Sequence, residues 1–184
     1  MAEYYLISQL PSLDGVSENM PLPITEERFF ELCERFLSKK ALCELNKLTL
    51  TPPKIPEASG SALINAWNDG ERELRLALEK ARAEKMKKPF DIKTGSLSVE
   101  LIKISNIAVE IEDPMEAEMF LFEYRLKFLE SIRPMDSFSE DYVFYFGLRL
   151  MLMQRIRRFD AGLGETAYKN IYSSILNGDR LEAI

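Results

Sequence analysis

The sequence predicts an all-α fold, an irregular bundle of about six to seven helices with an N-terminal docked arm. Apolar residues recur at three- and four-residue spacing through most of the chain, which is typical of helices that bury one face. Capping residues precede several of these segments, and Pro or Gly follows them. No segment offers a convincing partner strand, and a lone strand would leave its backbone donors unpaired.

The arm precedes the first helix of the bundle. It combines an aromatic segment over residues 4–10 with a turn at Asp14 and Gly15, and prolines stand at positions 11, 21 and 23. Thr25 then caps a helix in which Glu26 and Glu27 complement the helix dipole. The apolar stripe of this helix consists of Phe29, Leu32, Cys33 and Phe36. A second short helix follows, with Leu42, Leu45 and Leu48 on its apolar side.

The run TPPKIP over 51–56 must end that short helix, because proline breaks helices. A chain of 184 residues is the size of one domain and buries roughly 70% of its unfolded surface. We therefore expect a single helical domain over 1–184. A small N-terminal lobe over 1–50, joined by the Pro-rich linker 51–58, is the alternative organisation.

A long amphipathic helix begins after a cap at Ser59 or Ser61 and runs to Lys88. Its charges form pairs at helical spacing that are expected to solvate one face, namely Glu71 with Arg75, Lys80 with Glu84, and Glu84 with Lys88. Gly70 in the middle costs about 1 kcal/mol relative to alanine, which predicts a close helix crossing or a bend there. Residues 97–111 show both helical spacing and strand alternation, and the lack of a partner strand favours helix.

The motif DPME over 113–116 opens the next helix with an aspartate cap, a proline at the first helical position and a glutamate that completes a capping box. This helix ends at Pro134. Its predicted stripe comprises Met115, Met119, Phe122, Leu126 and Leu129. Ser137 and Glu140 repeat the capping-box spacing and predict the start of a further helix.

That helix contains YVFYFGLRLMLMQRIRRF, residues 142–159, and is predicted to be the centre of the bundle because nearly every direction of its first half is apolar. Arg149 points into the apolar side, where an unpaired charge costs several kcal/mol. We therefore predict a structural ion pair between Arg149 and a buried or half-buried carboxylate on a neighbouring helix. Gly162 or Gly164 closes the helix, and a last helix covers about 165–176.

Histidine is absent, which removes the common nucleophile pairs and histidine-ligated metals. Cys33 and Cys43 match neither a redox motif nor a metal framework, and we expect them to be reduced core thiols. The sequence AGLGET over 161–166 lacks the P-loop lysine and indicates a helix stop, and KTG over 93–95 lacks its Ser-x-x-Lys partner. The sequence predicts no catalytic, cofactor-binding or metal-ligating residues, and no enzyme.

Charge and length argue against nucleic acid and membrane insertion. The formal net charge is -6, and the basic clusters over 155–158 and 80–88 are expected to be solvated helix faces. The apolar run after Tyr142 is interrupted at Arg149 and ends by Met153, short of the ~20 residues that a bilayer needs. The N-terminus carries an acidic residue where a signal peptide needs basic ones, so we expect a cytoplasmic protein.

Three stretches carry a family resemblance: YYLISQLPSL near the N-terminus, AWNDGERELRLALEKARAEK from Ala66, and DPMEAEMFLFEYRLKFLESI followed by LRLMLMQRIRRFDAGLG. Together they resemble a bacterial family of undetermined function whose genes lie among the V/A-type ATP synthase subunits. The YLISQLP opening is also similar to the C-type subunit of those enzymes, the all-helical piece that seats the rotor shaft on the membrane ring. The chain is too short for the complete socket of that subunit, and no functional residue carries over.

The resemblance implies a non-catalytic structural, coupling or assembly subunit associated with a V/A-type rotary ATP synthase, or one similar to its C-type subunit. Its partners would be subunits of that complex, which would place it in the cytoplasm and peripheral to the inner membrane. The alternative is a free-standing helical adaptor that binds a partner helix through exposed aromatic and Met residues. A third hypothesis is a hydrolase, which requires two carboxylates converging in one desolvated pocket. The sequence indicates no partner-binding residues.

Overall fold

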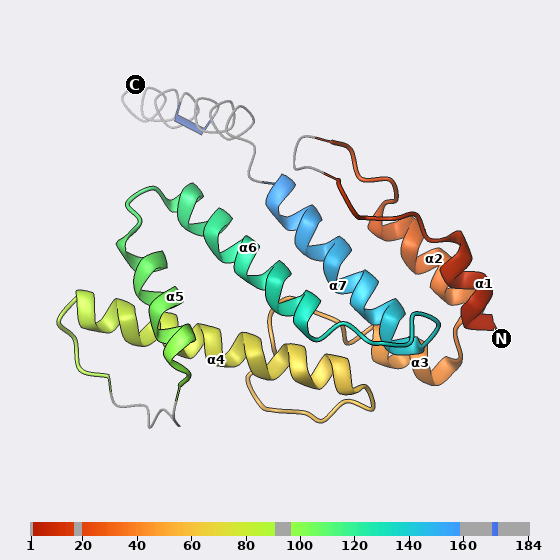
Figure 1. The fold of residues 1–184 in the computed structure, drawn as a ribbon, viewed down its shortest axis with the longest axis horizontal. Helices are drawn as coiled ribbons and strands as arrows, with labels where there is room; N and C mark the ends of the chain where they lie inside the picture. Colours follow the sequence, from red (N-terminus) through yellow and green to blue (C-terminus); the bar gives the residue numbers. More distant parts are fainter. Residues whose placement is uncertain (1, 17–19, 91–96, 159–170, 173–184) are drawn as a thin grey trace, which may run out of the picture.

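The computed structural model describes residues 2–16, 20–90, 97–158 and 171–172, and within these ranges every regular element is a helix (Figure 1). The elements are α1 (Ala2–Gln9), α2 (Glu26–Phe36), α3 (Lys39–Leu45), α4 (Ala62–Lys85), α5 (Val99–Glu110), α6 (Pro114–Ser131) and α7 (Glu140–Arg157). The all-α fold is therefore confirmed, and the ambiguous stretch 97–111 is the helix α5. The predicted glycine stop lies outside the described residues, as does most of the last predicted helix.

Side-chain caps start most of these helices. Thr25, Ser61 and Asp113 cap α2, α4 and α6 as predicted, each accepting a hydrogen bond from a backbone N–H in the first turn. The start predicted for α7 at Ser137 is wrong. Ser139 caps this helix instead and accepts from the Tyr142 N–H at 3.2 Å. The displacement arises because residues 136–139 form a separate turn before the helix.

The C-terminal end of α4 differs from the prediction that the helix runs to Lys88. The helix stops at Lys85, and Lys87 adopts a left-handed conformation with φ 54°. The Lys88 N–H then donates to the Ala83 carbonyl at 2.9 Å, and the Lys87 N–H donates to the Glu84 carbonyl at 3.1 Å. This is the Schellman arrangement, which satisfies the last carbonyls of a helix and usually uses glycine in the left-handed position. Because this position holds a lysine, the sequence lacks the glycine that usually marks the end of a helix.

Helix α7 is the centre of the bundle, as predicted, and lies between α6 and α2 (Figure 1). Its buried residues point in all directions and comprise Val143, Phe144, Tyr145, Phe146, Gly147, Leu148, Leu150, Leu152, Met153 and Ile156. The side chains of Phe29 and Leu48 crowd Gly147 so closely that a methyl group there would lie about 3 Å from both. Within the described part of the chain, no helix combines the length and apolarity needed to cross a membrane.

The N-terminal arm docks on this core through leucines. Leu6 in α1 and Leu13 after it are both buried in the cluster that surrounds α7. The same cluster contains Leu45 and Leu48, from before the Pro-rich run, and Trp67, from after it. The indole N–H of Trp67 donates to the Thr49 carbonyl at 3.2 Å. Residues on the two sides of the run 51–58 therefore share one hydrophobic cluster.

A second, smaller cluster occupies the far half of α4 and its contacts with α5 and α6. It consists of Leu74, Ala77, Leu78, Leu101, Ala108 and Leu121. Helices α4 and α6 each contribute to both clusters and cross between them. The crossing lies at Gly70, where the Phe128 ring of α6 occupies the space that a Cβ atom would need. The sequence predicted a close helix crossing or a bend at Gly70, and the group that lies against this glycine is the Phe128 side chain of α6.

Candidate functional site

Arg149 forms an ion pair with Asp14, with 2.6 Å between Nη1 and Oδ1. The location predicted for its partner is wrong, because Asp14 lies in the turn after α1 and not on a neighbouring helix. Its side chain is 71% exposed, whereas that of Arg149 is 22% exposed. The hydrogen bond and the charge of Arg149 hold the pKa of Asp14 below its ordinary value of 3.8. The pair therefore fastens the docked arm to the central helix.

The ion pair belongs to a larger polar network at one end of α6 and α7. Arg149 also donates to the Tyr145 hydroxyl at 3.4 Å, and that hydroxyl donates to Glu130 at 2.5 Å. Glu130 accepts a second hydrogen bond from Arg133 at 3.0 Å. Burial, followed by the bond to Glu130, raises the pKa of Tyr145 to about 12, so the phenol keeps its proton. These groups satisfy one another, and we assign them a structural role.

A second ion pair, buried at the crossing of α4 and α6, escaped the sequence reasoning. Glu71 does pair with Arg75 at 3.0 Å as predicted, but it is 2% exposed and does not lie on a solvated face. Its carboxylate also accepts two hydrogen bonds from Arg125 of α6, at 2.9 and 3.0 Å. Arg125 lies between the buried residues Leu121 and Leu129, so the deeply buried stripe of α6 is displaced from the predicted one.

The arginines at the C-terminal end of α7 were predicted to form a solvated face, but two of them contact other segments. Arg155 pairs with Glu118 of α6 at 3.2 Å. Arg157 donates to the carbonyl of Met20 from Nε at 3.1 Å and from Nη2 at 2.9 Å.

The cysteine prediction is half wrong, because Cys33 is buried but Cys43 is exposed on α3. The contacts of Arg155 and Arg157 stabilise the fold, and neither they nor the two cysteines form a cluster with the chemistry of an active site.

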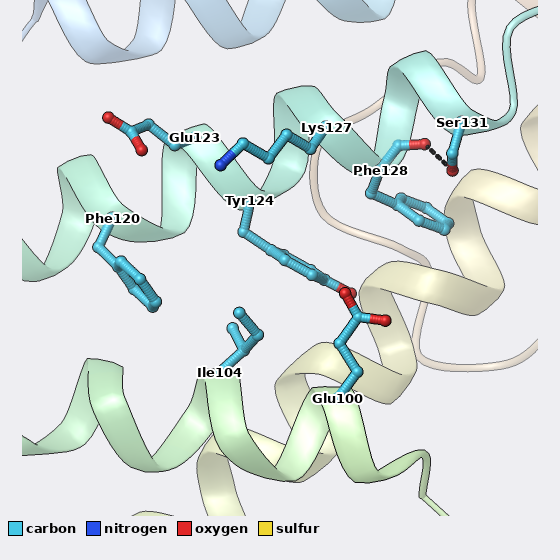
Figure 2. Close-up of a pocket in the computed structure, with 8 residues that line it drawn as sticks. All are labelled: Glu100, Ile104, Phe120, Glu123, Tyr124, Lys127, Phe128 and Ser131. Atoms are coloured by element: carbon cyan, nitrogen blue, oxygen red, sulfur yellow. Dashed lines mark hydrogen bonds between the residues drawn. The ribbon is translucent and has the colours of Figure 1, made fainter.

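A groove of about 360 Å³ lies between α5 and α6 (Figure 2). Its lining residues are Glu100, Ile104, Phe120, Glu123, Tyr124, Lys127, Phe128 and Ser131. Figure 2 shows the Tyr124 ring extending from α6 toward Glu100 on α5, with Glu123 and Lys127 at the other rim. Burial and the charges of Glu100, Glu73 and Glu71 raise the pKa of Tyr124. The groove therefore combines aromatic walls with a negative field.

The hydrolase hypothesis needs two carboxylates that converge in a desolvated site. Glu100 and Glu123 line the same groove, but both are exposed and Figure 2 shows them at opposite ends. Asp113 and Asp136 accept hydrogen bonds from nearby backbone N–H groups, and Asp141 accepts from Ser61 at 2.6 Å. The groove does not supply the convergent pair that this hypothesis requires. Over the described ranges, no group of three metal-ligating side chains is placed to hold an ion.

A different surface gathers exposed apolar side chains at the α1 end of the molecule. The Tyr4 and Phe138 rings stack with their centroids 5.0 Å apart, and Tyr5 packs edge-on against Tyr4 at 6.0 Å. Tyr4, Tyr5 and Phe138 are 55%, 60% and 52% exposed, and Met135 in the same α6–α7 loop is fully exposed. We call Tyr4, Tyr5 and Phe138 the aromatic surface. The sequence singled out the aromatic segment that holds Tyr4 and Tyr5 but not Phe138, because the contact between them depends on how α1 docks.

Comparison with known proteins does not assign this chain to a family. No protein family's sequence profile, no curated protein and no solved structure matches the chain. The motifs AGLGET (161–166) and KTG (93–95) lie outside the described residues.

Proposed function

We propose that this chain is a non-catalytic helical subunit or assembly factor of a V/A-type rotary ATP synthase, and that the aromatic surface binds its partner subunit. One observation supports the proposal most directly. The stretch YYLISQLPSL, which contributes to the resemblance, is the stretch that supplies Tyr4 and Tyr5. These rings lie exposed on α1 and not in the core. A resemblance that includes exposed aromatic residues favours binding over packing as their role.

The chemistry of the aromatic surface suits a protein partner. Tyr, Phe and Met are enriched at the centres of protein interfaces, where rings bury large areas at a small cost in side-chain entropy. A folded monomer rarely leaves several such residues together in water. The stacked pair of Tyr4 and Phe138 forms a broad apolar platform.

The aromatic surface is already assembled in the free chain. Buried Leu6 and Leu13 hold α1 against the core, and the ion pair between Asp14 and Arg149 closes the turn that follows. Tyr4 and Phe138 are therefore in contact in the chain on its own. A preformed surface lowers the ordering cost of association.

The alternative function, a free-standing adaptor, is favoured by the groove between α5 and α6. Figure 1 shows α5 at the opposite end of the molecule from α1. An adaptor with binding surfaces at its two ends could join two proteins outside any ATP synthase. The identity of the proteins that bind the aromatic surface separates the two functions.

Affinity purification of the tagged chain from its native cell, after mild cross-linking, tests the proposal. We expect ATP synthase subunits to be recovered with the wild-type chain and lost with the double variant Tyr4→Ser/Phe138→Ser. Ile55→Ser is the matched control, because Ile55 is 76% exposed in the Pro-rich run and outside the surface. Recovery of no ATP synthase subunit with an intact complex present would refute the assignment. Unchanged recovery with the double variant would refute the role of the aromatic surface as the binding site.

A further inference from the structure

The α5–α6 groove carries two carboxylates, Glu100 and Glu123, beside its apolar walls. Glu71, Glu118, Glu130 and Asp14 each have an arginine partner. Among the described residues, by contrast, Glu100 and Glu123 make no hydrogen bond or ion pair with a side chain or backbone group. The groove thus places unpaired carboxylates beside apolar walls that are open to solvent.

The balance of charge in the groove is negative. Two carboxylates and one ammonium, that of Lys127, line it. The Tyr124 phenol lies in the field of three carboxylates, which add to the effect of burial in raising its pKa. Apolar contact is available along Ile104, Phe120 and Phe128. An occupant that matches both features is apolar along its length and positively charged at its tip.

We propose that this groove binds a segment of a partner protein that carries an arginine flanked by apolar residues. The guanidinium fits better than an ammonium, because its plane stacks on the rings of Phe120 and Tyr124 while its edge reaches a carboxylate. A lysine or arginine stem also covers apolar surface while its head stays near water. The partner is thus defined by charge complementarity to Glu100 and Glu123.

The size of the groove limits the occupant to a short segment. A volume of about 360 Å³ is at the lower end of the range for ligand sites, about 300 to 1,000 Å³. This space holds one or two large side chains and not the whole face of a helix. Helix α5, which forms one wall of the groove, lies at the opposite end of the molecule from α1 (Figure 1), and the inference does not rest on the aromatic surface or on the proposed function.

Chemical-shift titration of the isotope-labelled full chain tests the inference. The probe is the capped peptide acetyl-Leu-Arg-Leu-Leu-amide, with otherwise identical peptides that carry citrulline or glutamate in place of arginine. We expect shifts confined to the backbone amides of α5 and α6 around Ile104 and Tyr124, and binding in the order arginine, citrulline, glutamate. Equal binding of all three peptides, shifts elsewhere, or no shift at millimolar peptide would overturn the proposal.

Substitutions at the rim of the groove should change its affinity for the arginine peptide in both directions. Glu100→Gln/Glu123→Gln should weaken arginine-peptide binding by about threefold, the effect of an exposed ion pair, and Lys127→Gln should strengthen it by a similar factor. Glu79→Gln is the matched control, because Glu79 is exposed on α4 outside the groove. Weaker binding to the Lys127 variant would overturn the charge argument. Equal binding of acetyl-arginine amide alone would overturn the peptide assignment in favour of a small organic cation.

Discussion

Arg125 of α6 donates two hydrogen bonds to the carboxylate of Glu71 on α4, from Nε at 2.9 Å and from Nη2 at 3.0 Å. The Glu71 side chain is 2% exposed and the Arg125 side chain 10% exposed. The pair lies where α4 passes from the large hydrophobic cluster around α7 to the smaller one beneath α5. Arg125 and Glu71 stabilise each other's charge there, and Glu71 also pairs with Arg75.

Removing one partner of this pair should therefore cost more than removing both. Arg125→Met leaves a buried carboxylate with Arg75 as its remaining partner, and we expect a loss of about 3 kcal/mol of unfolding free energy. Glu71→Met/Arg125→Met replaces the pair by apolar side chains and should cost less than about 1 kcal/mol. Urea denaturation at neutral pH measures both, with the exposed neighbour Glu73→Gln as the control. Additive losses in the double variant would contradict the coupling.

Gly70 should not tolerate a methyl group, although alanine is the better helix former by about 1 kcal/mol. A Cβ atom at this position overlaps the Phe128 ring, and such overpacking costs about 1 to 3 kcal/mol. Gly70→Ala should therefore lower the melting temperature, and Phe128→Ala in the same chain should convert the substitution to a neutral or stabilising one. Gly60→Ala is the control, because nothing lies within 4 Å of a Cβ there.

The ion pair between Asp14 and Arg149 should make stability depend on pH at the acidic end. The pKa of Asp14 is lowered in the folded chain, so its contribution is complete above the ordinary value of 3.8 and is lost as pH falls below it. Since Asp14 is largely exposed, Asp14→Asn should cost about 0.2 to 1 kcal/mol at pH 7. The difference from wild type should shrink toward zero as the pH falls below that value. A constant difference from pH 7 to pH 2 in thermal unfolding would show that the ion pair does not stabilise the fold.

The two thiols should differ sharply in reactivity. Burial raises the pKa of Cys33 to about 12, so at pH 8 it carries almost no thiolate, whereas Cys43 is exposed. Titration of the native protein with a chromogenic disulfide should modify one thiol, and Cys43→Ser should abolish that reaction. Unfolding in guanidinium should release the second. Rapid reaction of native Cys43→Ser would mean that α2 opens readily around Cys33.

The presence of the helices was predictable because the residues that indicate a helix lie within the segment itself. Asp113 with Pro114 marks the start of α6 and Thr25 that of α2, and both caps form the hydrogen bonds that the spacing implies. The boundaries that failed have local explanations too. Lys87 takes a backbone conformation that usually requires glycine, and the turn at Asp136 moves the cap of α7 to Ser139.

The polar contacts were predictable only in part, because their partners come from distant segments. The spacing of Glu71 and Arg75 correctly predicted their pair, but nothing in α4 indicates that α6 covers it and adds Arg125. The apolar surroundings of Arg149 required a carboxylate, yet its source is the turn of the arm at Asp14. The aromatic surface and the groove likewise depend on helix packing, which periodicity within one helix does not encode.

The central position of α7 also governs the order of events during synthesis. The ribosome makes Leu6 and Phe29 first, yet the side chains that cover them, such as Phe146, follow only after α3 to α6 have emerged. Until then the apolar sides of the early helices face water, and the nascent chain is open to chaperones and to aggregation. Phe138 also comes late, so an unfinished chain lacks the platform beside Tyr4.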